Sequence, residues 1–494
     1  MAETRKLINR IKALRKSADE KTGLLFDEII STLENRKYGL YFCEERKKEK
    51  VIEECESRVP TLILDETKTI INDGEDNILI EGDNYHSLKV LNSFNKNGID
   101  VIYIDPPYNE KNYDVMYRDS FVNYDGSRHD NWLSFMEKRI RLAHSLLKED
   151  GVMFISIDES EVANLKLLCN EIFGEDNFLV NMVVINSVNG IQYSDGFAKQ
   201  HSYCLCYQKS PSFKVNLLCL DEEDIRRKYN YGEDEAGPYY IERLWKRGIG
   251  GRKEDAPTMH FEVWYKEDTG EILIDEEIKG KNKDEYIRII PYHSKGVLGR
   301  WAWSREKMIK DRKQLIIRRS LGEYKLYKKV YASNEKGRRP QSIIDQRLGR
   351  TELGSKELNY IMGEKSFEYP KYSGLISYLI NLHSNKDAVV LDFFAGSGTS
   401  GQAVLDLNHK DKGKRRFILC TNNENGICEN VTYQRLRSVI TGIRKDGSRY
   451  SEGRRGNLYY LRTAFKDETD DSDTVDEDIF EFLKKTKHKK KVPD

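Results

Sequence analysis

The chain has 494 residues, and its 82 lysines and arginines balance its 82 aspartates and glutamates. This length allows large buried cores in roughly two to four domains, whereas a net charge of zero by itself indicates no class of partner. No apolar run approaches the roughly 20 residues of a membrane span, and residues 1–5 lack the apolar core of a signal peptide, so we expect a cytoplasmic protein.

The eight cysteines are scattered along the chain and include no Cys-x-x-Cys pair. Cys204 and Cys206 lie on one face of an alternating strand, but the further clustered ligands that a metal site needs are not apparent. We therefore expect reduced, mostly buried thiols and no metal site.

Residues 1–75 are highly charged and carry an apolar stripe that includes Leu24, Leu25 and Phe26, which predicts an N-terminal helical region. From residue 76 the pattern changes to short apolar runs that alternate with helices. Strands are predicted near residues 78–80, 101–104, 152–157, 179–185 and 202–207, and helices around residue 90, over residues 132–147 and up to residue 173. This alternation indicates a mainly parallel sheet covered on both faces, and we assign residues 76–210 to its first half.

The alternation stops after residue 210, and residues 211–350 mix aromatic, charged and short strand-like runs. Strands and helices return near residues 375–382, 388–391 and 417–420. We therefore expect one α/β domain, residues 76–210 and 351–464, interrupted by a domain inserted at residues 211–350. Residues 465–494 form an acidic run followed by a basic one, which is typical of a solvated or disordered tail.

A glycine-rich loop follows the predicted strand 388–391. It consists of Asp392, Phe393, Phe394, Ala395, Gly396, Ser397, Gly398 and Thr399. Closely spaced glycines let a ligand approach the free backbone amides at a helix start. The spacing of Gly396, Gly398 and Gly401 nearly meets a dinucleotide-binding pattern, and the Gly-Lys-Ser/Thr of an ATP-hydrolysing loop is absent. Alone, the loop indicates either a nucleotide-type cofactor or a tight turn without a ligand.

A second motif, Asp105-Pro106-Pro107-Tyr108, follows the strand 101–104, at the carboxyl end where open α/β sheets bind ligands. Two prolines fix the backbone and remove two amide donors, but their carbonyls stay available. An exocyclic amine could donate one N–H to Asp105 and the other to the Pro106 carbonyl, which would make its nitrogen a better nucleophile. Tyr108 offers a face on which a base can stack, worth about 1–3 kcal/mol. The alternative, a rigid turn with an exposed tyrosine, explains this combination poorly.

Together the two motifs resemble the S-adenosylmethionine-dependent amino-methyltransferases of DNA. The catalytic motif precedes the cofactor loop, which is the permuted order of the β class, and that class keeps its target-recognition domain between the two. Glu81-Gly82-Asp83-Asn84 and Phe367-Glu368-Tyr369-Pro370-Lys371 resemble two further segments of the family. Residues 251–257 and 299–304 are similar to stretches in the modification (Mod) subunits of type III restriction systems, and the resemblance points to that family specifically.

The resemblance implies a permuted Rossmann-like, S-adenosylmethionine-dependent methyltransferase sheet with an inserted target-recognition domain, and methylation of adenine N6. Asp105, Pro106, Pro107 and Tyr108 would hold an adenine flipped out of the duplex. The residues implied to bind the cofactor are Asp83, Lys371, Asp392, Phe394, Ala395, Gly396, Ser397, Gly398, Thr399 and Glu424. Among them Asp83 would face the cofactor's adenine, and Asp392 its ammonium. No metal is required.

Two positions depart from the family's pattern. Tyr372 follows Lys371 where the family usually has a proline. The strand 417–420 should end in an acidic residue for the cofactor ribose, but Thr421, Asn422 and Asn423 come first, which leaves Glu424 as the candidate.

Charge is uneven within the insertion. Residues 291–350 contain 17 lysines and arginines against 5 aspartates and glutamates, whereas residues 211–290 contain 14 against 19. The basic half suits phosphate contact, although charge runs are often only solvated. The predicted DNA contacts are Arg300, Arg312, Lys313, Arg318, Arg319, Arg338 and Arg339.

Several alternatives stay open. The acceptor could be cytosine N4 or RNA, but the family's cytosine-N4 members more often carry serine in place of Asp105. The chain could be a pure specificity module, or a nicotinamide-dependent oxidoreductase, which would not need the Asp-Pro-Pro-Tyr motif. The resemblance implies double-stranded DNA as substrate, a homodimer, and a separate helicase–nuclease (Res) partner, but a solitary methyltransferase fits the sequence equally well.

Overall fold

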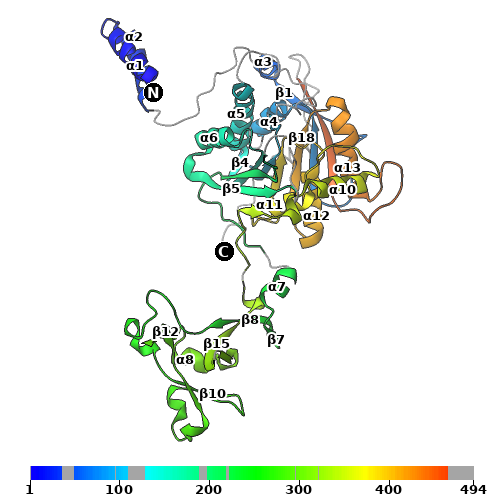
Figure 1. Ribbon diagram of the computed structural model, residues 1–494. Helices are drawn as coiled ribbons and strands as arrows, with labels where there is room; N and C mark the ends of the chain where they lie inside the picture. Colours follow the sequence, from blue (N-terminus) through cyan, green and yellow to red (C-terminus); the bar gives the residue numbers. More distant parts are fainter. Residues whose placement is uncertain are drawn as a thin grey trace, which may run out of the picture. The chain divides into compact units, whose positions relative to one another are not determined.

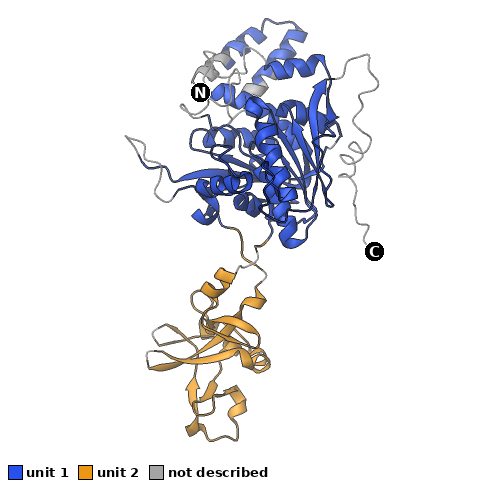
Figure 2. Cartoon of the chain, turned by 90° about the vertical axis from the view of Figure 1, so that its right-hand side faces the viewer, with its two compact units in different colours: residues 1–216, 341–494 blue, residues 217–340 orange. Residues whose placement is uncertain are grey.

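The computed structural model describes residues 2–35, 49–94, 96–109, 128–187, 197–218, 222–294, 296–320, 322–335 and 337–465. The predicted tail from residue 466 onward, Cys43 and Cys219 lie outside the described residues. Contacts divide the chain into two compact units (Figure 2), Met1–Asn216 with Gln341–Asp494, and Leu217–Pro340. In the part of the chain that is described, no helix is long and apolar enough to cross a membrane.

The larger unit is built on a ten-stranded sheet with the order β1-β19-β2-β18-β17-β3-β4-β6-β5-β16. Its strands are β1 (Pro60–Leu64), β2 (Asp76–Glu81), β3 (Ile99–Ile104), β4 (Leu147–Ile157), β5 (Phe178–Ile185), β6 (His201–Gln208), β16 (Ile343–Ile344), β17 (Val389–Asp392), β18 (Arg416–Thr421) and β19 (Asn457–Phe465). The central run from β19 to β4 is parallel throughout, and antiparallel pairs join β1 to β19, β4 to β6 and β6 to β5. The prediction of a mainly parallel sheet is confirmed.

Helices lie on both sides of this sheet (Figure 1). They are α3 (Lys50–Ser57), α4 (Asn84–Phe94), α5 (Arg128–Leu146), α6 (Val162–Phe173), α9 (Gln346–Gly349), α10 (Thr351–Met362), α11 (Ser373–Ile380), α12 (Thr399–Asp411) and α13 (Tyr433–Thr441). The α4–α5–α6 layer buries apolar side chains such as Leu88, Met136 and Leu165 in one core with the strands. β3 is buried along its whole length, as expected for a central parallel strand.

The prediction that the N-terminal region is helical up to residue 75 is wrong. It begins with α1 (Ala2–Arg15), α2 (Glu20–Asn35) and α3, but Pro60–Leu64 then forms β1, which pairs antiparallel with β19. The run Pro-Thr-Leu-Ile-Leu favours a strand, because a proline is tolerated at the first residue of an edge strand and the apolar residues fit a pleated surface.

The smaller unit, Leu217–Pro340, is mostly β structure. Its elements are α7 (Glu222–Lys228), β7 (Gly232–Asp234), β8 (Gly237–Arg243), β9 (Val263–Lys266), β10 (Glu271–Ile274), β11 (Ile287–Ile289), β12 (Tyr292–Ser294), β13 (Val297–Leu298), α8 (Arg305–Lys310), β14 (Leu315–Ser320) and β15 (Glu323–Tyr331). A four-stranded sheet, β14-β15-β8-β7, and a three-stranded sheet, β10-β9-β11, share a core around Trp301, Leu326 and Val263. The unit therefore has a core of its own.

Candidate active site

The two motifs lie side by side in the sheet, although 392 − 105 = 287 positions separate Asp105 from Asp392. Their strands, β3 and β17, are parallel neighbours, with Val390 opposite Val101 and Leu391 opposite Ile102. Both loops therefore leave the same edge of the sheet, which we call the catalytic edge. Residues at the ends of β4 and β18 lie at this edge too, because both strands run parallel to β3 and β17.

The catalytic motif forms a polar cluster with Lys371. The Tyr108 hydroxyl donates to Asp105 Oδ1 at 2.8 Å, and Lys371 Nζ lies 3.0 Å from Asp105 Oδ2. Lys371 Nζ also donates to the Tyr108 hydroxyl oxygen at 2.8 Å and lies 5.0 Å from the centroid of its ring. Burial and the neighbouring Asp105 carboxylate hold the pKa of Tyr108 well above its usual value, so this hydroxyl remains a donor.

The two proline carbonyls of the motif differ in their contacts. Trp132 Nε1 of α5 donates to the Pro107 oxygen at 2.7 Å. Among the described residues nothing donates to the Pro106 oxygen. Below the turn, the Asn109 amide donates to the fully buried Glu161. The turn is therefore fixed from one side, and one carbonyl beside Asp105 is left to accept a hydrogen bond from a ligand.

The glycine loop leaves room for a ligand beside its backbone. Gly396 and Gly398 have φ angles of 49° and 76°, which side chains other than glycine rarely adopt. A Cβ at Gly396 would make only ordinary van der Waals contact, at 3.8 Å, with Phe367 and Phe394, so the backbone is not crowded there. Within the described chain, the amides of Gly396 and Ser397 make no hydrogen bond. A cradle with free amides at the start of α12 fits a polar, nucleotide-type cofactor.

Behind the loop, the fully buried Arg435 of α13 ties the loop to two helices. Its guanidinium donates to Ser397 Oγ at 3.1 Å, to Thr399 Oγ1 at 2.7 Å and to Gln402 Oε1 at 2.8 Å, and it pairs with Glu357 at 3.3 Å. Burial lowers the pKa of Arg435 to about 10, so it stays charged near neutral pH. The shape of the loop therefore depends on a residue outside the motif.

Replacing Arg435 with methionine is expected to lower the free energy of unfolding by roughly 2–4 kcal/mol, because it leaves buried acceptors and Glu357 without their partner. The thermal unfolding midpoint measures this effect. Arg437→Met on the same helix is the control, because Arg437 is only half-buried and its side chain makes no hydrogen bond or ion pair within the described chain. Equal midpoints for the two variants would contradict the anchoring role.

Asp392 lies at the end of β17 and is buried. Its carboxylate accepts from the Phe394 amide at 3.0 Å and from Ser400 Oγ at 2.5 Å. Burial raises the pKa of Asp392 to about 7, although these two hydrogen bonds oppose the shift. Without a cation beside it, this carboxyl is therefore half protonated near neutral pH.

The two other carboxylates predicted to bind the cofactor are placed differently. Asp83, before α4, accepts from the Tyr85 amide at 2.7 Å and lies 3.6 Å from the buried Arg139. Glu424 is exposed in a short 3-10 turn after β18, and no contact of its carboxylate is found within the described ranges. Both lie beyond the carboxyl ends of strands β2 and β18, at the catalytic edge.

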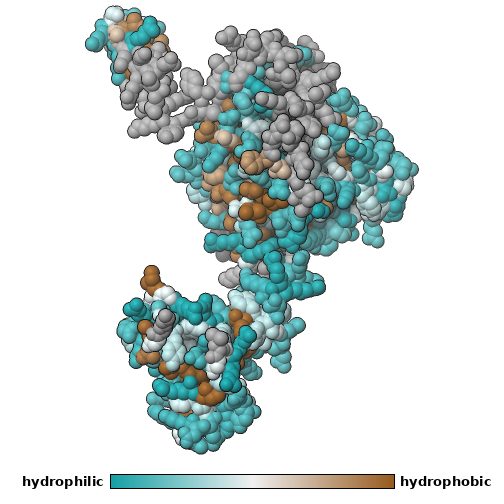
Figure 3. Space-filling view, in the orientation of Figure 1, coloured by the Kyte–Doolittle hydropathy of each residue, from teal (hydrophilic) through white to brown (hydrophobic). Residues whose placement is uncertain are grey.

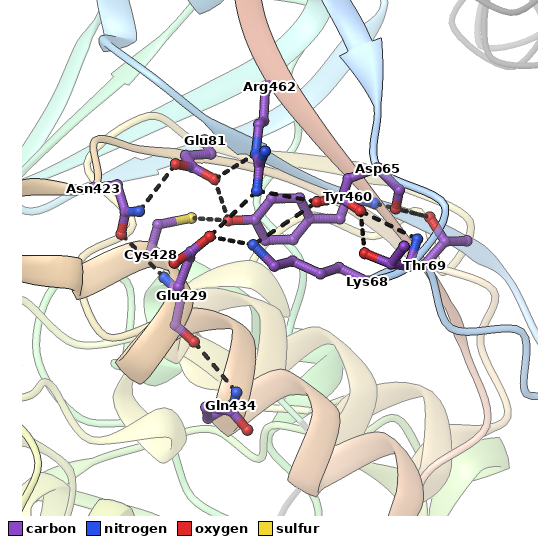
Figure 4. Close-up of polar contacts among 11 residues, drawn as sticks. Asp65, Lys68, Thr69, Glu81, Asn423, Cys428, Glu429, Gln434, Tyr460 and Arg462 are labelled. Carbon is purple, nitrogen blue, oxygen red and sulfur yellow. Dashed lines mark hydrogen bonds and ion pairs between the residues drawn. The ribbon is translucent and has the colours of Figure 1, made fainter.

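A network of polar contacts fills the space between these strand ends (Figure 4). Glu81 accepts from Asn423 at 3.0 Å and from Arg462 at 3.1 Å, and Tyr460 donates to it. Around them lie Asp65, Lys68, Thr69, Cys428, Glu429 and Gln434. Because Glu81 and Asn423 already hold each other, Glu424 is the carboxylate at the end of β18 that is left to meet a ligand.

One further group of possible metal ligands lies outside this site. Asp100, Asp150 and His383 are close enough together to hold an ion. However, Asp100 already accepts from Lys148 at 2.7 Å, from Asn385 at 3.1 Å and from the Val389 amide at 2.8 Å. These contacts account for its buried charge as a structural feature.

The seven basic residues predicted to contact DNA fall into two groups in the smaller unit. Arg312 pairs with Glu277, Arg338 pairs with Asp224 at 3.1 Å, and Arg300 Nε donates to the Gly250 carbonyl at 2.6 Å. The other four are exposed, and no ion pair of theirs is found among the described residues: Lys313, Arg318, Arg319 and Arg339. Arg319 stacks on the ring of Tyr324. Arg312 and Arg338 are therefore already paired with carboxylates, whereas the charges of Arg300 and of the second group have no such partner among the described residues.

The chain is similar to known DNA-modifying proteins. A family model described as DNA methylase (N6/N4) matches residues 99–432. The type II methyltransferase M.KpnI of Klebsiella pneumoniae is 34% identical over 365 residues, which are 73% of this chain and 84% of that protein. The EcoPI Mod subunit of a type III restriction-modification enzyme, from Escherichia phage P1, is 32% identical over 397 residues, 74% of this chain. This chain spans only 61% of that subunit.

Among solved structures, the complex of M1.HpyAVI with SAM is similar over 73% of this chain and 98% of its own, at 14% identity and a TM-score of 0.31.

Proposed function

Because the chain belongs to the family of N6/N4 DNA methylases, we propose that it transfers a methyl group to N6 of adenine in double-stranded DNA. One observation carries the choice of an exocyclic amine as acceptor: the Asp105 carboxylate lies beside a Pro106 carbonyl that nothing in the described chain uses. The two N–H bonds of an amine match these two acceptors. Adenine is favoured over cytosine because the family's cytosine-N4 enzymes more often carry serine at this position.

The chain's own residues position and activate the base. A flipped adenine would stack on Tyr108, while Asp105 and the Pro106 carbonyl accept the two N6 hydrogens. These bonds draw the nitrogen lone pair out of the ring and aim it toward the glycine loop, so catalysis is mainly positioning and electrostatic support. Lys371 holds both Asp105 and Tyr108 in place.

S-adenosylmethionine is the cofactor of this family and, when bound, supplies the electrophilic methyl group. The uncrowded backbone at Gly396 and the free amides of Gly396 and Ser397 fit its methionine end. Asp392 would meet its ammonium, Glu424 its ribose and Asp83 its adenine. The remaining residues of the cradle are Phe394, Ala395, Gly398 and Thr399.

The affinity for S-adenosylmethionine is expected to rise with pH up to about 7 and then to level off. The pKa of Asp392 is about 7 in the free protein, whereas an ammonium beside it would favour the charged form and lower that pKa. Below pH 7 the carboxyl must therefore release a proton on binding, which weakens binding roughly tenfold for each pH unit. By the same linkage, the free protein loses stability as the pH rises from about 4 to 7, because the folded state holds this proton more tightly.

Calorimetric titration at a series of pH values tests this dependence. In Asp392→Asn the amide can keep both hydrogen bonds but cannot ionise, so the affinity should be weak and nearly independent of pH. The same slope in wild type and variant would exclude Asp392 as the group that meets the ammonium.

Single-molecule sequencing of DNA from cells that express the chain tests the proposed function. N6-methyladenine at one recurring sequence is the expected result, and N4-methylcytosine would overturn the choice of base. A pure specificity module would leave the DNA unmodified and would bind no S-adenosylmethionine in a titration of the purified chain.

The wider assignment also rests on similarity. Similarity to the EcoPI Mod subunit, and to the StyLTI Mod subunit of Salmonella typhimurium (30% identical over 453 residues), supports a modification subunit of a type III restriction-modification system, with a Res helicase–nuclease as its partner. The name of M.KpnI equally supports an enzyme without such a partner. We propose the smaller unit, Leu217–Pro340, as the target-recognition domain, which is narrower than the predicted 211–350 because β16 pairs with β5 in the larger unit. Lys313, Arg318, Arg319 and Arg339 are its proposed phosphate contacts, and a homodimer is the proposed assembly.

A further inference from the structure

Phe197 is an aromatic residue whose side chain is 99% exposed. Single exposed apolar side chains are common on protein surfaces, so exposure alone indicates no function. In the view of Figure 3 hydrophilic side chains cover most of the described surface. What distinguishes Phe197 is its place in the larger unit, because it lies in the segment that enters β6.

The start of β6 lies at the catalytic edge. Because β6 runs antiparallel to β4, its first residues lie next to the carboxyl end of β4, with Tyr203 opposite Ile157. β4 is in turn the parallel neighbour of β3, which Asp105 directly follows. The segment before β6 therefore begins only two strands away from the catalytic turn.

Contacts hold this segment against the edge. Lys199 Nζ lies 3.4 Å from Asp158 Oδ2, directly after β4, and the Asn186 amide donates to the Gln200 carbonyl at 2.8 Å. Phe197 is two residues from the first of these contacts. Its ring is thus presented to solvent at the edge where the target base must enter, with Lys199 and the exposed His201 nearby in sequence.

Flipping a base leaves a gap in the DNA stack, and proteins that distort DNA often insert an apolar wedge between base steps. We propose that Phe197 enters the base stack of the DNA and fills the space that the flipped adenine leaves. This inference rests on the proposed function. In this position the exposed ring of Phe197 would stack on the neighbouring bases, which have lost their stacking with the flipped adenine.

The experiment compares two synthetic duplexes that carry the site found by sequencing, one fully paired and one with an abasic position opposite the target adenine. Removing the pairing partner makes extrusion easier, so a wedge matters less. Phe197→Ala is expected to methylate the paired duplex roughly tenfold more slowly than wild type, but the abasic duplex within about threefold of it. Phe197→Trp should retain most of the wild-type rate on both.

Ile71→Ala is the matched control. Ile71 is also exposed (67%), but it follows Ile70, which pairs with Leu458 near the start of β19, at the opposite edge of the sheet. It should methylate both duplexes like wild type.

Three outcomes would overturn the inference: an unchanged rate of Phe197→Ala on the paired duplex, an equal loss on both duplexes, or a changed oligomeric state in sedimentation, which would place Phe197 between copies of the chain. If wild type methylates neither duplex, the proposed function itself fails.

Discussion

Replacing Asp105 with alanine is expected to abolish methyl transfer to DNA while leaving the binding of S-adenosylmethionine nearly unchanged. In the proposed mechanism the carboxylate is one of the two acceptors for the target amine, and in the structure it holds Tyr108 and Lys371 through its two oxygens. Losing a single electrostatic contact that acts on the reacting atom costs about a hundredfold to a thousandfold in rate. Transfer of a labelled methyl group and calorimetric titration measure the two properties separately.

Asp105→Asn is the informative companion variant. It keeps one carbonyl oxygen that can accept from the amine but loses the charge that pairs with Lys371, so its rate should lie between those of wild type and Asp105→Ala. Undiminished transfer by Asp105→Ala would refute the mechanism. Loss of cofactor binding in that variant would instead indicate that the turn also shapes the glycine loop.

Seven of the ten strands, all except β1, β16 and β19, could be predicted because most of them are short apolar runs buried on both faces. β3, for example, reads Ile-Asp-Val-Ile-Tyr-Ile and is buried throughout. β1 could not, because its only partner in the sheet is β19, about 400 positions away. Its five residues follow a charged helical region, and the local sequence pattern therefore predicted that the helical region continues through them.

The two motifs could be predicted as contiguous sequences, but the residues that support them could not. Trp132 holds the Pro107 carbonyl and Arg435 holds the glycine loop from helices far from either motif in sequence. No local pattern marks such contacts, because an amphipathic helix explains both residues equally well.

In the smaller unit, the numbers of charged residues did not predict which basic side chains are available to DNA. A surplus of lysines and arginines indicates a basic surface, but it cannot show which cations are already paired. Arg312 with Glu277 and Arg338 with Asp224 are ion pairs whose acidic partners lie 35 and 114 positions away. Both acidic partners, Glu277 and Asp224, lie in the acidic part of the insertion, residues 211–290. Its charge therefore partly neutralises the basic part, residues 291–350.

For Lys371, the resemblance identified a residue of the site but did not predict the contacts of its side chain. The family's pattern implied a contact with the cofactor, and Lys371 does reach the glycine loop through its backbone, since its carbonyl accepts from Thr399 Oγ1 at 3.3 Å. Its ammonium, however, contacts Asp105 and Tyr108, the latter 263 positions away. The side chain therefore acts on the catalytic turn, and the main chain on the loop.

Lys371→Met is therefore expected to lower the rate of methyl transfer much more than the affinity for S-adenosylmethionine. Methionine keeps most of the length and the backbone contact but removes two charge-assisted contacts, each worth about 1.5–3 kcal/mol. Together they correspond to a loss of roughly a hundredfold to ten-thousandfold in kcat. The dissociation constant of the cofactor should stay within about threefold of wild type. Lys365→Met, an exposed residue six positions earlier whose ion partner is Glu368 at 3.6 Å, is the control and should change neither value. If the variant loses affinity for the cofactor and keeps kcat, the side chain of Lys371 contacts the cofactor instead of the catalytic turn. Loss of kcat alone would establish that one lysine joins the two halves of the site.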